Sequence, residues 1–151
     1  MGLLDKLKSA VNVVTGGAAK VSIEVVGDAR IGAPISVRVT LASTGGEVKS
    51  DGVFVDFAGE EELHIPKRDD DKLTEDYRRE HHHSAQSFRL SGPFVLGAGE
   101  QKVVEGSFSL PPDLQPSFAG RWSKNHYLIR GRLEARGNDP DSGYQPIRVI
   151  G

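Results

Sequence analysis

The sequence has 151 residues, of which 37% are hydrophobic and 26% charged, as is typical of one globular domain with a single core. Its 19 lysines and arginines are balanced by 21 aspartates and glutamates, for a formal net charge of -2. Nucleic-acid binding is not expected, because it rests on an excess of basic side chains. The absence of cysteine excludes disulfide bonds and thiolate chemistry, and it is compatible with the reducing cytoplasm, where we expect the protein.

The first segment, residues 1–17, is predicted to form a short amphipathic helix followed by a glycine linker. Between residues 3 and 14, apolar side chains recur at the spacing of one helical face, and Gly16 and Gly17 end the helix. The apolar face consists of Leu3, Leu4, Leu7, Ala10, Val11 and Val14. Polar residues interrupt the stretch, so we expect neither a signal peptide nor a transmembrane helix.

A helix of this length is marginal alone in water, so its apolar face is expected to pack against something. Two interpretations are equally supported: the face docks on the chain's own domain, or it contacts a protein partner or a second copy of the chain. Membrane-surface contact ranks third, because Lys6 and Lys8 are offset by Asp5 and the helix has neither Trp nor Phe. Peripheral attachment to the inner membrane face is therefore kept as an alternative.

From residue 18 onward, the hydrophobic pattern has the two-residue period of half-buried strands. The clearest run is 35–42, where apolar side chains alternate with Ser, Arg, Thr and Ala. Three strands are predicted in this half of the chain, marked by Val21, Ile23 and Val25, by Ile35, Val37, Val39 and Leu41, and by Val53, Val55 and Phe57.

Residues 59–83 differ from this pattern. Carboxylates outnumber basic side chains there, and apolar residues are sparse. Long polar segments between strands usually run over the surface of a domain. We therefore predict a long polar excursion within a single domain that spans residues 18–151.

Strand patterning resumes at Phe88 and continues to the end of the chain, with a clear alternating run at 125–135. Seven or more short strands separated by turn signals predict an all-β, immunoglobulin-like antiparallel β-sandwich. The side chains expected to face inward are Val37, Val39, Phe108, Tyr127, Ile129 and Leu133.

The proline-rich segment 111–118 is predicted to be a rigid connection between two sheets. Pro111, Pro112 and Pro116 lack the backbone N–H that a central strand requires. Phe118 and Trp122 are expected to anchor the connection by burying aromatic surface.

Three consecutive histidines, His81 to His83, are the first candidate for site chemistry. In a strand, His81 and His83 project from the same side, and imidazole is a good ligand for zinc, nickel or copper. Few apolar side chains surround the run to fix a ligand geometry. A solvated polar segment is the favoured interpretation, so we predict no metal ligands and no cofactor, and a metal-binding module built on His81–His83 remains the alternative.

Arg130 and Arg132 lie on one face of a predicted strand, together with Arg136 and interrupted by Glu134. Such a row can contact an acidic partner or lipid headgroups. More often it is a solvated face whose cations pair with neighbouring carboxylates. Arg130 and Arg132 join the apolar helix face as candidate interaction residues.

Catalytic patterns are missing from the sequence. It contains no G-x-S-x-G elbow, H-E-x-x-H helix, P-loop or G-x-G-x-x-G loop. We therefore predict a non-enzymatic protein without catalytic residues.

Four motifs follow one another in the second half of the chain: LGAGEQKVVEGSFSLPPDL at 96–114, PPDLQPSF at 111–118, NHYLIRGRLEA at 125–135 and PIRVI at 146–150. Their order and spacing resemble the arrestin N-domain superfamily, above all the bacterial sporulation-control proteins of the stage-zero sporulation protein M family. The N-terminal helix followed by AKVSIEVVGD is similar to the start of those proteins.

The resemblance implies an arrestin-like sandwich and a regulatory or cell-organising role. We expect a scaffold or adaptor that binds protein partners through its sheet edges, the 59–83 segment or the N-terminal helix. Members of that family usually continue into a second sandwich, so a function that needs the cleft between two sandwiches is not expected here.

Overall fold

The computed structural model describes residues 18–151, and the predicted N-terminal helix lies outside the described residues. The described chain is all-β, as predicted, with one short 3-10 helix, η1. No helix in these residues has the length and apolar character needed to cross a bilayer. In chain order the elements are β1 (Ala19–Val26), β2 (Ala29–Arg30), β3 (Pro34–Ser43), β4 (Val48–Ile65), η1 (Lys67–Asp69), β5 (Tyr77–Ser91), β6 (Phe94–Leu96), β7 (Gln101–Ser109), β8 (Phe118–Ala119), β9 (Ser123–Ala135), β10 (Gln145–Ile147) and β11 (Val149–Ile150).

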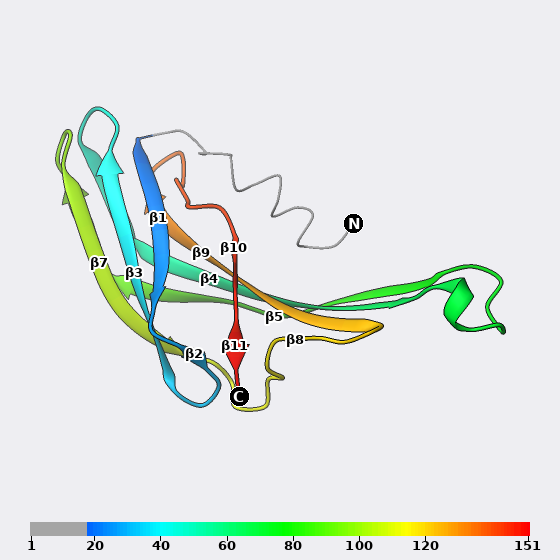
Figure 1. Ribbon diagram of the computed structural model, residues 1–151. Helices are drawn as coiled ribbons and strands as arrows, with labels where there is room; N and C mark the ends of the chain where they lie inside the picture. Colours follow the sequence, from blue (N-terminus) through cyan, green and yellow to red (C-terminus); the bar gives the residue numbers. More distant parts are fainter. Residues whose placement is uncertain (1–17) are drawn as a thin grey trace.

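The strands form two antiparallel sheets and one small parallel pair. The smaller antiparallel sheet has the order β1-β3-β7. The larger has the order β10-β9-β4-β5, with β6 paired to β4 and β8 paired to β9. The parallel pair joins β11 to β2. Figure 1 shows β1, β3 and β7 grouped on one side of the molecule.

The apolar faces of the two antiparallel sheets pack on each other. All six side chains predicted to face inward are buried, namely Val37, Val39, Phe108, Tyr127, Ile129 and Leu133. Phe57 of β4 and Phe108 of β7 contact across the core, with ring centroids 6.3 Å apart. A Cβ atom on Gly131 of β9 would lie 3.2 Å from Cβ of Ile23 on β1, so the sheets approach closely there.

Residues 59–83 form a long hairpin, which we call the arm. The β4–β5 ladder runs without a gap from Gly59↔His83 to Ile65↔Tyr77, and η1 lies in the connection between the two strands. In Figure 1 the distal end of the arm, with η1, extends beyond the end of β9, which pairs with β4 as far as Leu63↔Ser123. The predicted polar excursion is thus a regular ladder, whose polar composition suits strands that leave the core.

Candidate functional site

A hydrogen-bond network around the buried Asn125 connects the root of the arm to the proline-rich segment. The side chain of Asn125 on β9 donates to the backbone oxygens of Gln115 and Pro116, at 3.1 and 3.0 Å. Its amide oxygen is thereby left to accept from Nε2 of His83, at 2.8 Å. Burial raises the pKa of Tyr127, and its protonated hydroxyl donates to the same Gln115 oxygen at 2.6 Å. The root of the arm is therefore tied to the proline-rich connection.

Gly59 makes this arrangement sterically feasible. A Cβ atom at this position would lie 2.4 Å from Cε1 of His83, so any other residue would displace the imidazole ring. The ring also packs edge-on against Tyr127, with centroids 5.5 Å apart. Gly59 and His83 therefore fit together at the point where the arm leaves the core.

The turn between β8 and β9 is bound to the distal part of the arm. Gly120 N–H donates to the Ser123 oxygen at 2.7 Å, which places Arg121 and Trp122 at the tip of the turn. His64 N–H on β4 donates to the Trp122 oxygen at 2.7 Å. The indole N–H of Trp122 donates to Oδ2 of Asp69 in η1 at 3.2 Å. Backbone and side-chain bonds thus join the turn to the arm.

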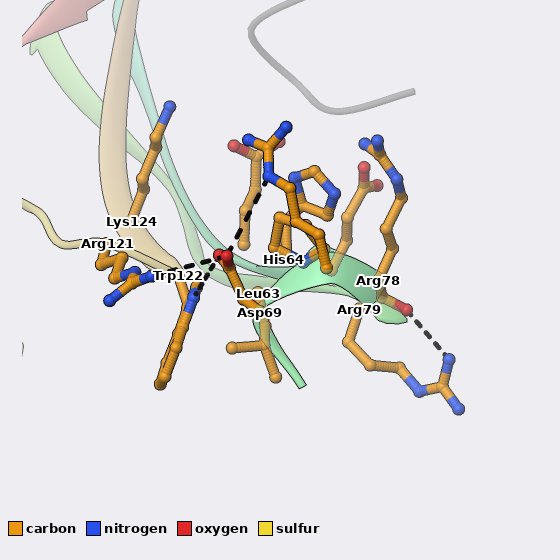
Figure 2. A pocket seen from close by; sticks show the side chains of 12 residues that line it. Leu63, His64, Asp69, Arg78, Arg79, Arg121, Trp122 and Lys124 are labelled. Atoms are coloured by element: carbon orange, nitrogen blue, oxygen red, sulfur yellow. Dashed lines mark hydrogen bonds and ion pairs between the residues drawn. The ribbon is translucent and has the colours of Figure 1, made fainter. Parts of the chain in front are cut away.

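Between the turn and the arm lies a cavity of about 570 Å³, which we call the arm cleft. Its walls come from β4, η1, β5 and the start of β9. Figure 2 shows Asp69 within the cleft, joined to Arg121 and Trp122. The lining residues are Glu62, Leu63, His64, Pro66, Arg68, Asp69, Arg78, Arg79, Glu80, Arg121, Trp122 and Lys124.

Cations outnumber carboxylates in the arm cleft. Asp69 is shared by Arg121 at 3.4 Å and Arg68 at 4.0 Å. Arg79 and Lys124 also line the cleft, and neither makes an ion pair within residues 18–151. Unneutralised cations beside a concave surface produce a local positive potential that attracts anionic groups.

The aromatic side chain of the cleft is exposed. Trp122 is 40% exposed, and the guanidinium group of Arg121 lies 5.2 Å from its ring centroid. Phe118 is also 40% exposed. The expectation that Phe118 and Trp122 are buried anchors is therefore wrong: Tyr127 and Asn125 hold the proline-rich connection instead, through backbone oxygens.

A cleft that combines an exposed tryptophan with cations that make no ion pair is suited to polypeptide recognition. Trp and Arg are enriched at protein interfaces, because both combine a large contact area with hydrogen-bond donors. The arm cleft can hold a carboxylate with its cations and an apolar side chain against the indole ring.

The structure pairs both candidate arginines with one buried carboxylate. Arg130 and Arg132 each donate to Asp56, at distances of 2.6 to 3.3 Å, and Ser87 donates to the same carboxylate at 2.7 Å. Burial alone would raise the pKa of Asp56, but these hydrogen bonds and the positive charge of Arg130 outweigh it and hold the pKa below its usual range. Their geometry is that of cations paired with neighbouring carboxylates, and a role in partner contact stays a prediction.

The histidine run is divided between the two faces of the arm. His81 and His83 share one face, with their rings stacked 6.1 Å apart. His82 lies on the other face, with Nδ1 3.2 Å from Oε2 of Glu60. The run therefore does not gather its three imidazoles around one point.

The arm cleft was not predicted from the sequence. Its residues come from three stretches of the chain, 62–69, 78–80 and 121–124, and no regular spacing links them. The only local signals are two pairs of adjacent residues: Arg78 and Arg79, and Arg121 and Trp122, which lie between the proline-rich segment and the run at 125–135. Neither pair indicates a cleft by itself, because only the folded arm places these residues around one cavity.

The described chain is thus an all-β domain of antiparallel sheets with a projecting arm and a cation-rich cleft. Its fold is similar to that of the sporulation control protein Spo0M from Bacillus subtilis, with a TM-score of 0.64 and 23% sequence identity. The match covers 89% of this chain and 50% of that protein, so the chain spans about half of its length. No family model and no curated protein sequence matches the chain. The resemblance inferred from the sequence motifs is confirmed at the level of the fold.

Proposed function

We propose that this chain is a non-enzymatic scaffold or adaptor domain that binds an acidic segment of a partner protein in the arm cleft. The observation that carries the proposal is a cleft that contains the exposed Trp122 together with Arg79 and Lys124, two cations without ion-pair partners in residues 18–151. Exposed sheet edges and the predicted N-terminal helix supply further contacts with a partner or a second copy.

The position of the cleft supports this proposal. The arm is held at its root by the hydrogen bond between His83 and Asn125, and its distal end, where η1 contributes to the wall of the cleft, extends beyond β9 (Figure 1). A pre-formed docking site loses little conformational entropy on binding.

A regulatory role is supported by the fold. The two packed sheets fit an arrestin-like β-sandwich, and Spo0M, which shares the fold, is described as a sporulation control protein. We propose that the domain likewise acts as a regulatory protein, in the cytoplasm, through protein–protein contacts. The role of Spo0M itself does not identify the partner.

Reversing the charge of the two free cleft cations is expected to weaken binding of an acidic peptide by at least about tenfold. Trp122 is the only tryptophan in the sequence, so its intrinsic fluorescence reports the cleft directly. Titration with a synthetic peptide of alternating Glu and Leu is expected to change this fluorescence in wild type, with an affinity that falls as salt is added. The variant Arg79→Glu/Lys124→Glu is expected to lose the response.

The matched control is Lys20→Glu/Lys49→Glu, which changes the net charge equally at two exposed positions outside the cleft. We expect it to bind like wild type. Equal loss of binding in both double variants would indicate a non-specific charge effect and contradict docking in the cleft. So would a wild-type protein whose tryptophan fluorescence ignores the peptide.

Substitutions in the predicted N-terminal helix test its part in assembly. If its apolar face contacts a partner or second copy, Leu4→Asp/Leu7→Asp is expected to leave the melting temperature nearly unchanged and to abolish an oligomer in sedimentation velocity. If the face docks on its own domain, the same variant melts many degrees lower, because it removes buried side chains and buries charges. Liposome co-sedimentation tests the membrane alternative. If the helix contacts lipid, the wild type pellets with liposomes and the variant does not.

A further inference from the structure

One face of the arm gathers carboxylates and imidazoles from three neighbouring strands. Glu60 of β4 pairs in register with His82 of β5, and Glu62 pairs with Glu80. On the other side of β4, Glu60 pairs with His126 of β9. Residues two apart in a strand share a face, and directly opposed residues share it too. All five side chains therefore project from the same surface.

Three of these side chains converge closely. Glu60, Glu80 and His82 each offer a ligand atom, and these atoms lie within 4.8 Å of one another. The Glu60 side chain is completely buried, and its Oε2 atom is 3.2 Å from Nδ1 of His82. Next to this group, His126 Nε2 contacts Glu62 Oε2 at 3.1 Å. The donor set has one member fixed by burial, while the exposed Glu80 and His82 can adjust toward an incoming ion.

We propose that Glu60, Glu80 and His82 form a binding site for Zn²⁺, with Glu62 available as a fourth ligand. Mixed imidazole and carboxylate donors suit Zn²⁺, whereas Mg²⁺ and Ca²⁺ prefer oxygen ligands alone. Tetrahedral zinc with bonds of about 2.1 Å holds its ligand atoms about 3.4 Å apart, so small movements of Glu80 and His82 complete the site.

This site is different from one built on the histidine run. His81 and His83 lie on the opposite face of the arm, and His83 is already engaged by Asn125 and Ser84, at 2.8 and 2.9 Å. Only His82 of the run faces the carboxylates. The bound ion would link β4 to β5 midway along the arm. The site borders the arm cleft, because Glu62 and Glu80 also line it, but the metal proposal does not rest on the proposed docking function.

Isothermal titration of the untagged full chain with ZnCl₂ at pH 7.5 tests the site. We expect one ion per chain in wild type, and a loss of affinity of at least about tenfold in His82→Ala and in Glu80→Gln, since each removes a ligand atom. His81→Ala, its matched control on the other face, is expected to bind like wild type. Co²⁺ in place of Zn²⁺ is expected to give the visible absorption of a four-coordinate ion, and His82→Ala to abolish it.

The two tested ligands are exposed, so their variants are expected to fold, and thermal melting without metal checks this. Absence of stoichiometric binding to wild type would overturn the proposal. Equal losses in His81→Ala and His82→Ala would also overturn it, because they would indicate loose chelation by the run. Peptide binding to the cleft is measured separately by Trp122 fluorescence, so failure of the metal site and failure of the docking function are distinguishable.

Discussion

Replacing Phe57 by alanine is expected to lower the free energy of unfolding by about 3–5 kcal/mol. Phe57 is 1% exposed and lies at the centre of an aromatic group in the core. Its ring stacks on Tyr127 at 5.2 Å and contacts Phe108 at 6.3 Å. The substitution removes this contact area and leaves a cavity between two sheets whose strands are fixed by their ladders, so the core cannot collapse to fill it.

Urea unfolding followed by circular dichroism measures this effect. The control is Val103→Ala on β7, where the side chain is 49% exposed and a change within about 0.5 kcal/mol is expected. The loss of unfolding free energy in Phe57→Leu is expected to lie between those of Val103→Ala and Phe57→Ala, because leucine retains part of the buried volume. A loss for Phe57→Ala no larger than for Val103→Ala would contradict the position assigned to this ring.

The core strands were predictable because a strand with one buried face alternates apolar and polar residues along the sequence. Ile35 and Leu41 of β3 are both completely buried. Between them, buried valines alternate with polar residues, as the pattern predicts. The run at 125–135 gave β9 in the same way. Alternation determines the face of each strand, and the inward-facing set follows from it.

The arm was not predictable as a ladder, because polar residues lie on both of its faces and no two-residue period results. A register shift between Phe57 and Gly59 also interrupts the pattern at its root. Gly59 gave no signal that it accommodates the ring of His83, which lies far along the chain. Only the pairing between β4 and β5 in the structure shows that residues 59–83 form a ladder.

The arm cleft escaped prediction for a related reason: charge spacing along a chain does not give distances in space. Trp122 was expected to anchor the proline-rich connection by burying aromatic surface, but its indole N–H donates to Asp69 at the protein surface. The sequence predicted that Arg130 and Arg132 pair with carboxylates, but it did not identify which carboxylate. Their shared partner Asp56 lies on a neighbouring strand, and only the register of β4 and β9 brings it opposite Arg130.

Asp56→Ala is the second substitution expected to have a large effect, a loss of about 2–4 kcal/mol at pH 7. The Asp56 side chain is 7% exposed and accepts hydrogen bonds from Arg130 and Arg132, whose side chains are 28% and 19% exposed. Without it, two half-buried guanidinium groups face each other. Asp141 and Asp139, at 3.9 and 3.6 Å from these groups, compensate only in part.

The effect of Asp56→Ala is also expected to depend on pH. The pKa of Asp56 in the folded protein lies below its ordinary value, so folding favours the ionised carboxylate. Its stabilising contribution is complete above the unfolded pKa, near 4, and is lost as the pH falls through the lower folded pKa. Urea unfolding of wild type and variant between pH 7 and pH 2 should therefore show a difference that shrinks at the acid end. Asp113→Ala, which removes an exposed carboxylate, is expected to match wild type at pH 7, and an Asp56→Ala difference that stays constant down to pH 2 would contradict the ionised Asp56 pairing.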